Sequence, residues 1–282
     1  MTANQNQRRP FYLANPIQGQ YYGNVDGYVT DGTQRYNGML LSVARRAGRG
    51  TIVSANYTLS HCEGSPDGSG GGTANLGTGY NDPNNPHFDD GNCTSDRRHV
   101  FTLTAGVESP RFEGSSAALR AAASGWRLVG SFRAMSGPYL NIVPGSDRAL
   151  NSQAGTQRVN QVLDGPYGDN SFNPTNGGRI FLNPLAFAQP AFGTQGTLPR
   201  NSVKGIGYKN VDMSLSRLFR ITNTRTVEVR VEAFNAFNWF GWGAPSATAQ
   251  GQPNQTLSGA TFGQITSAGD PRFLQFGIKF GF

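Results

Sequence analysis

The last residues of the chain alternate between apolar and polar or small side chains. The apolar positions are Leu274, Phe276, Ile278, Phe280 and Phe282, and the positions between them are Gln275, Gly277, Lys279 and Gly281. Successive side chains of a β-strand point to opposite faces. The pattern therefore predicts a strand over 271–282 with one apolar face and one polar face.

The same alternation occurs at 225–237, where charged side chains occupy every second position. Glu228, Arg230 and Glu232 share one face of this predicted strand, opposite valines on the other. Together with Lys279 they form a candidate charge ladder, which in a membrane barrel would line the lumen. Paired carboxylates can perform acid–base catalysis, but Arg230 between the two glutamates favours the ladder.

Alternating segments along the whole chain predict about eight strands of 11 to 14 residues. They lie at 34–46, 50–62, 97–109, 124–137, 209–219, 225–237 and 271–282, with a weaker candidate at 20–30. Strands of soluble proteins average about 5–6 residues, whereas crossing a bilayer at a tilt takes about 9–11. The lengths favour a membrane barrel, although a soluble β-sandwich would alternate in the same way.

The connections between these strands alternate in length. Short or moderate connections at 47–49, 110–123 and 221–224 alternate with long ones at 63–96, 138–208 and 238–269. Outer-membrane barrels have short periplasmic turns and long external loops, and three structureless loops of this length are improbable in a soluble domain. The sequence thus predicts an antiparallel transmembrane β-barrel segment, all-β, with Phe282 at the periplasmic end.

Several aromatic residues fall near the predicted strand ends, where a barrel carries aromatic girdles. They are Tyr36, Tyr57, Trp126, Trp239, Phe240 and Trp242. Ordinary packing in a core or a loop explains them equally well.

Composition agrees with a β fold. Hydrophobic residues make up 37%, Gly and Pro number 38 and 16, and the mean hydropathy is −0.44. No apolar run reaches the ~18 residues that a membrane-spanning helix needs, so this chain could cross a membrane only as a barrel. The beginning of the chain lacks the apolar core of an export signal, so we expect either a cytosolic chain or a fragment.

The formal net charge is +7, and most of the basic residues are arginines. They are scattered along the chain without a basic helix or an aromatic ribonucleoprotein motif, so no nucleic-acid partner is predicted. The glycine-rich stretch at 64–72 lacks the Gly-Lys-Ser/Thr ending of a phosphate loop. No cofactor is implied, and the chain is not expected to be an enzyme.

Cys62 and Cys93 bracket a loop-like stretch and are the only cysteines. Such a pair predicts a disulfide if the compartment is oxidising. His61, His87 and His99 lie nearby, so a zinc site stays open as the alternative, although the spacing fits no familiar module.

Two polar clusters lie in or beside the first long connection. Asp96, Arg97, Arg98 and His99 form a loop-base polar cluster, which we interpret as a structural ion-pair knot at the barrel mouth rather than a ligand site. Asp82, Asp89 and Asp90 could bind calcium, but they lack EF-hand spacing, and solubility of the loop is the simpler interpretation.

An ordered run of sequence blocks carries a family resemblance. The blocks are YNGMLLSVARRAGRGTIVSANYTLSHC, CTSDRRHVFTLTAGVESP, GIGYKNVDMSLSRLFRI, VEVRVEAFNAFNWFGWGAPS and TFGQITSAGDPRFLQFGIKFGF. In these blocks the chain resembles the closing strands of Oar-like TonB-dependent receptors, which carry a carboxypeptidase-regulatory-like domain at the N-terminus. The long loops lie outside the resemblance.

The resemblance implies an outer-membrane transporter of a Gram-negative bacterium. Its partners would be outer-membrane lipid, TonB through a plug domain, and the barrel-assembly machinery, which would recognise Phe276, Ile278, Phe280 and Phe282 as a terminal signal. A complete receptor of this kind has an export signal, a TonB box, a plug and roughly 22 strands, none of which this chain supplies in full. We therefore expect the product of a truncated gene or an isolated C-terminal segment. The alternative is a structural or adhesive outer-membrane barrel that does not transport.

Overall fold

A computed structural model describes residues 6–23, 31–48, 50–66, 80–82, 84–110, 112–151, 155–222, 224–240 and 252–282. Strands dominate these residues, and the strand pairs are antiparallel. The all-β fold class is thereby confirmed. None of the described helices has the length and the apolar character needed to cross a bilayer.

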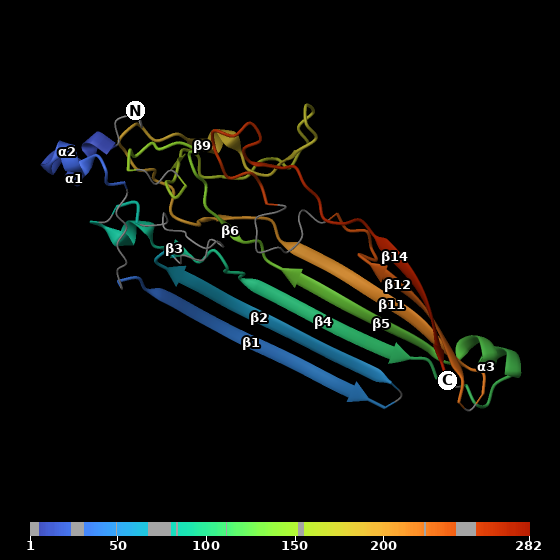
Figure 1. Ribbon diagram of the computed structural model, residues 1–282. Coiled ribbons are helices and arrows are strands. Elements are labelled where there is room, and N and C mark those ends of the chain that lie inside the picture. The colour runs from blue at the N-terminus through green and yellow to red at the C-terminus, as the bar shows by residue number, and fades with distance from the viewer. Residues whose placement is uncertain are drawn as a thin grey trace.

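One large sheet contains all the long strands, paired in the order β1-β2-β4-β5-β11-β12-β14 (Figure 1). These strands are β1 Gln34–Ala47, β2 Thr51–Gly64, β4 His99–Glu108, β5 Trp126–Met135, β11 Tyr208–Arg220, β12 Thr226–Phe234 and β14 Phe273–Gly281. The short β3, Gly91–Asn92, pairs with β2. Each long strand pairs with the long strand that follows it in the chain, so the sheet is an up-and-down meander.

The long strands lie on seven of the segments that the sequence pattern marks, whereas the weak candidate at 20–30 gives no strand where it is described. Residues 20–23 follow helix α2, Pro16–Gly19, as turn and coil, and 24–30 lie outside the described residues. Asn15 caps α2 by accepting hydrogen bonds from the backbone N–H groups of Ile17 and Gln18. That cap starts a helical turn directly before the segment where alternation predicts an extended chain.

The strand register places one apolar row beside the next across the sheet. Val231 lies opposite Leu215 on one side and Phe276 on the other, Leu215 lies opposite Leu128, and Leu128 lies opposite Val107. Direct partners in an antiparallel pair lie on the same face, so these side chains form one continuous apolar face. The side chain of Phe276 is 74% exposed, because this face has no protein layer over it.

The opposite face of the sheet is polar. Ser216 lies opposite Arg127 and Arg230, and Arg127 lies opposite Glu108. Arg127 Nε approaches Glu108 Oε1 at 3.9 Å. A sheet with one exposed apolar face and one charged face matches the wall of a membrane barrel, whose lipid-facing and lumen-facing residues alternate.

The two outer strands of the sheet remain edges. Among the described residues, β1 pairs only with β2, and β14 only with β12. The described part of the chain is therefore an open wall rather than a closed barrel.

The connections between the strands lie at two ends of the sheet. The connections at 48–50, 109–125 and 221–225 are short or moderate and share one end with the C-terminus, as Figure 1 shows. The moderate one contains helix α3, Ala117–Ala123, which Ser116 caps by accepting from the backbone N–H of Leu119 at 3.3 Å.

The long connections at 65–98, 136–207 and 235–272 gather at the other end. We call their described residues the loop cap. Short helices and strand pairs occur within it: η3 Pro86–Asp89 and η4 Pro184–Ala186, and the pairs β6 Tyr139–Leu140 with β10 Val203–Lys204, β7 Asn160–Gln161 with β9 Phe187–Ala188, and β8 Arg179–Ile180 with β13 Gln264–Ile265. Two further helical turns, η2 Asn6–Arg8 and α1 Pro10–Ala14, precede α2.

The buried hydrophobic core of the molecule lies in the loop cap and not on the sheet. Its members are Leu140, Ile142, Val159, Leu182, Ala186, Phe187, Leu198, Val203 and Phe262. They come from the second and third long connections, and the rings of Phe187 and Phe262 meet edge to face at 5.6 Å. The long connections are therefore folded, although strand patterns in the sequence assign them no structure.

A charged side chain placed on either face of β11 tests the assignment of the two faces. Leu215→Arg introduces a charge in the middle of the apolar face, and Ser214→Arg introduces the same charge on the polar face beside Glu232. Because a cation near the bilayer midplane costs about 2–4 kcal/mol, we expect Leu215→Arg to lower the free energy of unfolding from lipid vesicles by that amount. Ser214→Arg should change it by less than ~1 kcal/mol. If urea titrations gave the two variants the same loss in the free energy of unfolding, the assignment of the faces would be contradicted.

Candidate functional site

The predicted charge ladder lies on the polar face of β12 and β14. Glu228 lies directly opposite Lys279, and Arg230 Nε lies 3.5 Å from Glu232 Oε1. The register places all four side chains on the same face, together with Arg127 and Glu108, which sequence inspection did not single out. Each carboxylate of the ladder thus has a cationic neighbour on the same face of the sheet.

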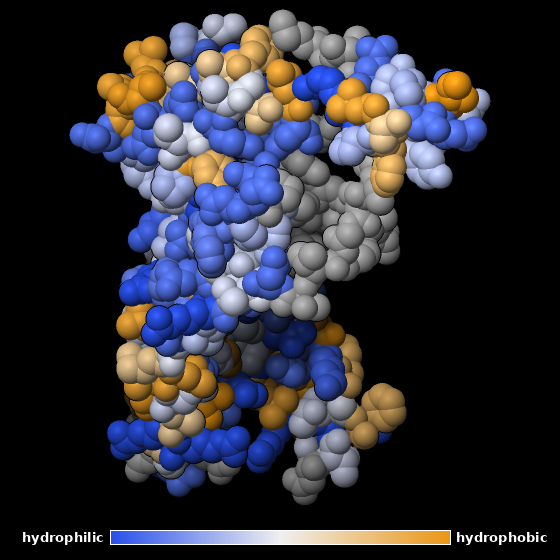
Figure 2. Space-filling view, turned by 90° about the vertical axis from the view of Figure 1, so that its left-hand side faces the viewer, coloured by the Kyte–Doolittle hydropathy of each residue, from blue (hydrophilic) through white to orange (hydrophobic). Residues whose placement is uncertain are grey.

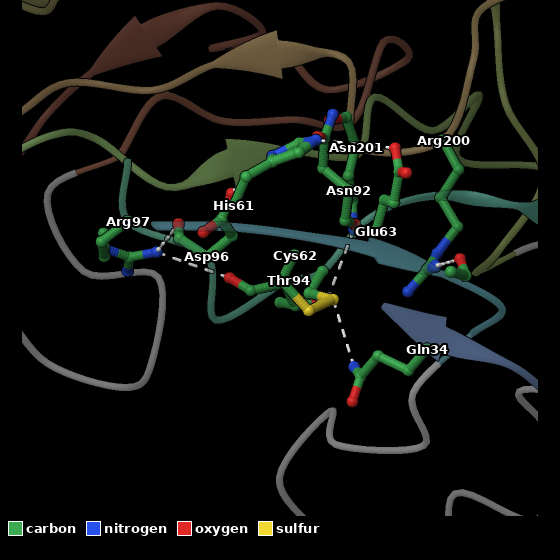
Figure 3. The surroundings of a disulfide bond; sticks show 12 residues. Gln34, His61, Cys62, Glu63, Asn92, Thr94, Asp96, Arg97, Arg200 and Asn201 are labelled. Atoms are coloured by element: carbon green, nitrogen blue, oxygen red, sulfur yellow. Dashed lines mark hydrogen bonds and ion pairs between the residues drawn. A yellow bond between two sulfur atoms is a disulfide. The ribbon is translucent and has the colours of Figure 1, made fainter. Parts of the chain in front are cut away.

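Cys62 and Cys93 form a disulfide at the base of the loop cap, and no free cysteine occurs in the chain (Figure 3). The backbone N–H of Cys93 also donates to the carbonyl of Cys62 at 3.0 Å, and the side chain of Gln34 donates to Cys93 Sγ. The first long connection is thus clamped to the end of β2. Among the residues that the structure describes, no group of His, Cys, Asp or Glu is arranged to hold a metal ion.

The predicted loop-base cluster is divided, and it is not the ion-pair knot that we expected. Asp96 is buried and contacts His61, with Nδ1 to Oδ2 at 3.4 Å, and within the described ranges it forms no ion pair with Arg97 or Arg98. Arg97 instead donates to the carbonyl of Asp96, and burial lowers the pKa of its guanidinium. His99 Nδ1 shares a hydrogen bond with the hydroxyl of Tyr57 at 2.7 Å.

The division follows from strand geometry. His99 is the first residue of β4, so its side chain takes its place in the alternation of the sheet, while Asp96 belongs to the turn after Cys93. The side chains of Asp96 and His99 therefore lie in different surroundings, although only two residues separate them in the sequence. Figure 3 shows Asp96 beside His61 and Arg97 at the edge of the cluster.

A buried ion pair that sequence inspection missed joins the first two long connections. Arg158 pairs with Asp89, and their side chains are each 2% exposed. Arg158 also donates to the carbonyls of Phe88 and Leu198 at 2.8 and 2.9 Å, and its guanidinium stacks 4.2 Å from the Phe88 ring centre. Asn81 donates to Asp89 through both its backbone and its side chain.

Asp89 was expected in a solvated or calcium-binding loop, and the structure contradicts both interpretations for this residue. Inside the loop cap the Asp89 carboxylate pairs with Arg158 and accepts hydrogen bonds from Asn81. Asp90 instead accepts from Ser65 and lies 2.8 Å from His87 Nδ1. Asp82 bonds locally, accepting from the backbone N–H of Asn84.

Further hydrogen bonds interlock the same two connections. Asn201 donates to the carbonyl of Asn92 at 2.7 Å, and Asn92 donates back to the carbonyl of Asn201 at 2.8 Å. Arg200 donates to the carbonyl of Gly64, at the end of β2. The loop cap is therefore fixed both to the sheet and within itself.

A pocket of about 580 Å³ opens where β11, β12 and β14 enter the loop cap. Asp212 lies in its wall and accepts from Asn210 and from the backbone N–H of Asn235. Asn235 adopts a left-handed backbone (φ 48°), which asparagine tolerates better than most residues. Its side chain bonds the backbone of Trp239 and the carbonyl of Asp270, so the turn after β12 is tightly held.

Part of the predicted aromatic girdle is present at the strand ends of the described residues. Trp126 lies at the end with the short connections, and Trp239 at the loop-cap end, where the Lys209 ammonium lies 4.6 Å from its ring centre. Phe240 is exposed, and Trp242 lies outside the described residues. The surface seen from the side of the loop cap is largely hydrophilic, with separate hydrophobic patches (Figure 2).

The four residues of the predicted terminal signal lie on or just after β14. Phe276, Ile278 and Phe280 are on the apolar face, opposite valines of β12, and Phe282 follows the strand with its side chain fully exposed. The signal thus coincides with an edge strand.

An open, long-stranded antiparallel sheet with one exposed apolar face is the architecture of a membrane-spanning β wall. A family model described as an outer membrane beta barrel domain matches residues 1–275. The chain belongs to this family, and the protein is located in the bacterial outer membrane. Neither the curated proteins nor the solved structures provide a match.

The buried ion pair makes the loop cap sensitive to a single substitution. Arg158→Met leaves the Asp89 carboxylate buried without its cation, which typically costs about 3–5 kcal/mol. We expect hydrogen exchange of buried cap amides such as Val159 to accelerate strongly. Arg148→Met is the matched control, because Arg148 donates to the carbonyl of Pro190 and stacks on Phe192, and among the described residues it forms no ion pair with a carboxylate. Equal exchange in the two variants would show that the ion pair does not hold the cap together.

Proposed function

We propose that this chain is a C-terminal barrel segment of a TonB-dependent outer-membrane receptor that takes up a bulky substrate. The observation that carries the proposal is the open wall: a polar face lined with charges, an apolar face for lipid, and two strand edges that pair with nothing in the described part of the chain. Backbone groups at such edges must find partners in lipid, so further strands would complete the barrel.

The size of the loop cap also supports a wide barrel. Barrels of about eight strands are filled by their own side chains, whereas larger ones enclose a channel or a plugged lumen. A cap with its own hydrophobic core at one end of the wall would form a preorganised external vestibule. The pocket beside Asp212 and Asn235 lies at the transition from this vestibule to the polar face, where a descending substrate would pass.

We further propose that the polar face guides a substrate and does not catalyse a reaction. Glu228 has Lys279 opposite it, and Glu232 has Arg230 beside it. The two glutamates thus belong to a row of alternating charges along one face of the sheet, whereas a catalytic acid and base converge on a bound substrate.

An adhesive barrel is the second candidate, and one observation favours it. Several large apolar side chains of the loop cap are exposed, among them Phe172, Leu185 and Phe192. Exposed apolar surface on a folded cap suits a surface partner. Such a barrel would need neither a plug nor TonB.

Crosslinking to TonB distinguishes the two candidates. An antibody raised against this chain is used on outer membranes of the native organism, before and after formaldehyde crosslinking in energised cells. If the protein is a TonB-dependent receptor, the antibody should detect a band well above the 30.2 kDa of this chain. After crosslinking it should also detect a larger product that reacts with an antibody to TonB. A band at the mass of the chain, with no such product, would favour the adhesive barrel and refute the proposal.

The terminal strand provides a separate test of partner recognition. If Phe282 belongs to a signal that the barrel-assembly machinery reads, its deletion should slow assembly in cells. The measurement is the fraction of chain that migrates as the folded, heat-modifiable form after a pulse of synthesis. Phe273→Ala is the control, because Phe273 lies on the same strand but at its other end and on the polar face. Similar delays in both variants would indicate general destabilisation of β14 rather than loss of a signal.

A further inference from the structure

Cations on the lipid-facing side of the sheet occur at its two ends. Arg45 and Arg217 lie at the end with the short connections, and Lys209 lies at the end near the loop cap. Between them this face is apolar, and at the short-connection end none of its described strand residues is acidic. Long cationic side chains at such positions reach the headgroup level of a bilayer.

Arg217 is held by aromatic rings and by helix α3. Its guanidinium lies 5.2 Å from the ring centre of Trp126 and 4.7 Å from that of Phe219, and it donates to the carbonyl of Ala121. Trp126 Nε1 donates to the carbonyl of Ala122 at 2.8 Å. Both contacts tie the C-terminal carbonyls of α3 to side chains of the lipid-facing surface.

Helix α3 itself is an exposed, largely apolar segment. It consists of alanines with Leu119 and Arg120, and most of its residues are exposed. A short apolar helix with one cation, placed beside a girdle tryptophan, suits the plane of the membrane interface. Figure 1 shows α3 beside the C-terminus, at the end opposite the loop cap.

A pocket of about 1020 Å³ lies under this helix. Residues of both faces of the sheet line it: Arg217, Trp126 and Phe219 belong to the lipid-facing side, whereas Arg127, Arg220, Glu108 and Glu228 belong to the polar face. Arg120 of α3 and Glu113 complete its charged lining. Arg127 lies near Glu108, and Glu228 lies opposite Lys279, so two of the three glutamates already have cationic neighbours. None of the ion pairs within the described ranges involves Arg120 or Arg217.

We propose that Arg217, Arg120 and Trp126 form a binding site for the phosphate of an anionic phospholipid in the inner leaflet of the outer membrane. The arginine fork matches phosphate geometry with paired N–H donors. Trp126 and Phe219, whose rings flank the Arg217 guanidinium, would lie against the glycerol and upper acyl region. The site rests on the membrane location of the sheet and is independent of transport.

Native mass spectrometry of the full chain in detergent, titrated with phosphatidylglycerol, measures the affinity. One cation near an anionic lipid contributes about fivefold in affinity, so Arg217→Gln and Arg120→Gln should each weaken binding by roughly that factor. Arg133→Gln is the control, since Arg133 lies on the polar face, opposite Thr102 and Asn210. Unchanged affinity in both site variants, or an equal loss in the control, would overturn the proposal. Displacement of the lipid by an equal concentration of inorganic phosphate would also overturn it, because the site would then be a free-anion site.

A second measurement does not depend on refolding. Photoactivatable phosphatidylglycerol is incorporated into outer-membrane fractions that contain the protein, and the crosslinked peptides are mapped. The proposal expects crosslinks concentrated in 116–127 and 215–220. Crosslinks distributed evenly along the lipid-facing strands would refute a specific site.

Discussion

Backbone hydrogen bonding in a medium without water is the constraint on which this structure depends. Inside a bilayer each N–H and C=O must pair within the protein, because an unpaired group costs several kcal/mol. The meander from β1 to β14 meets this requirement for the strands between its edges and leaves the outer sides of β1 and β14 unpaired in the described chain. The same constraint fixes the alternation, since paired strands can present only one face to lipid and the other to a lumen.

The loop cap is stabilised by different interactions from the sheet. It lies beyond the lipid, so its stability comes from a hydrophobic core, from the buried pair of Arg158 and Asp89, and from the clamp of Cys62 and Cys93 at its base. A buried ion pair requires many hydrogen bonds to offset desolvation, and Arg158 has them in the carbonyls of Phe88 and Leu198. Two stabilising systems thus coexist in one chain, and they meet at the strand ends.

The sheet could be predicted from the sequence because the pattern that specifies a strand and its two faces lies within a few neighbouring residues. Alternation at Val227 to Ala233 and again at Leu274 to Phe280 indicates two strands and their faces, and the length of the connections indicates their direction. The cap could not be predicted in this way. Asp89 and Arg158 are 69 residues apart, and nothing near Asp89 distinguishes a buried carboxylate from a solvated one.

Two short helices lie outside the period-two pattern. Ser116 followed by an alanine-rich run is a capped helix start, and Asn15 before Pro16 is another. Strand alternation does not predict either of them, because helices of four and seven residues are too short to show a helical period. The divided cluster around Asp96 shows the reverse problem: four adjacent charged residues suggest one site, but entry into β4 separates their side chains.

The central claim is that one face of this sheet contacts lipid and the other contacts water. Spin-label accessibility measured residue by residue along β12 tests it most directly. Single spin labels at successive positions from Val227 to Ala233, in protein embedded in outer-membrane vesicles, report accessibility to oxygen and to a water-soluble nickel complex. The structure predicts an alternation with period two, with oxygen favoured at the valines and nickel favoured at Glu228, Arg230 and Glu232. Uniform access of the nickel complex to all these positions would contradict a membrane-spanning wall.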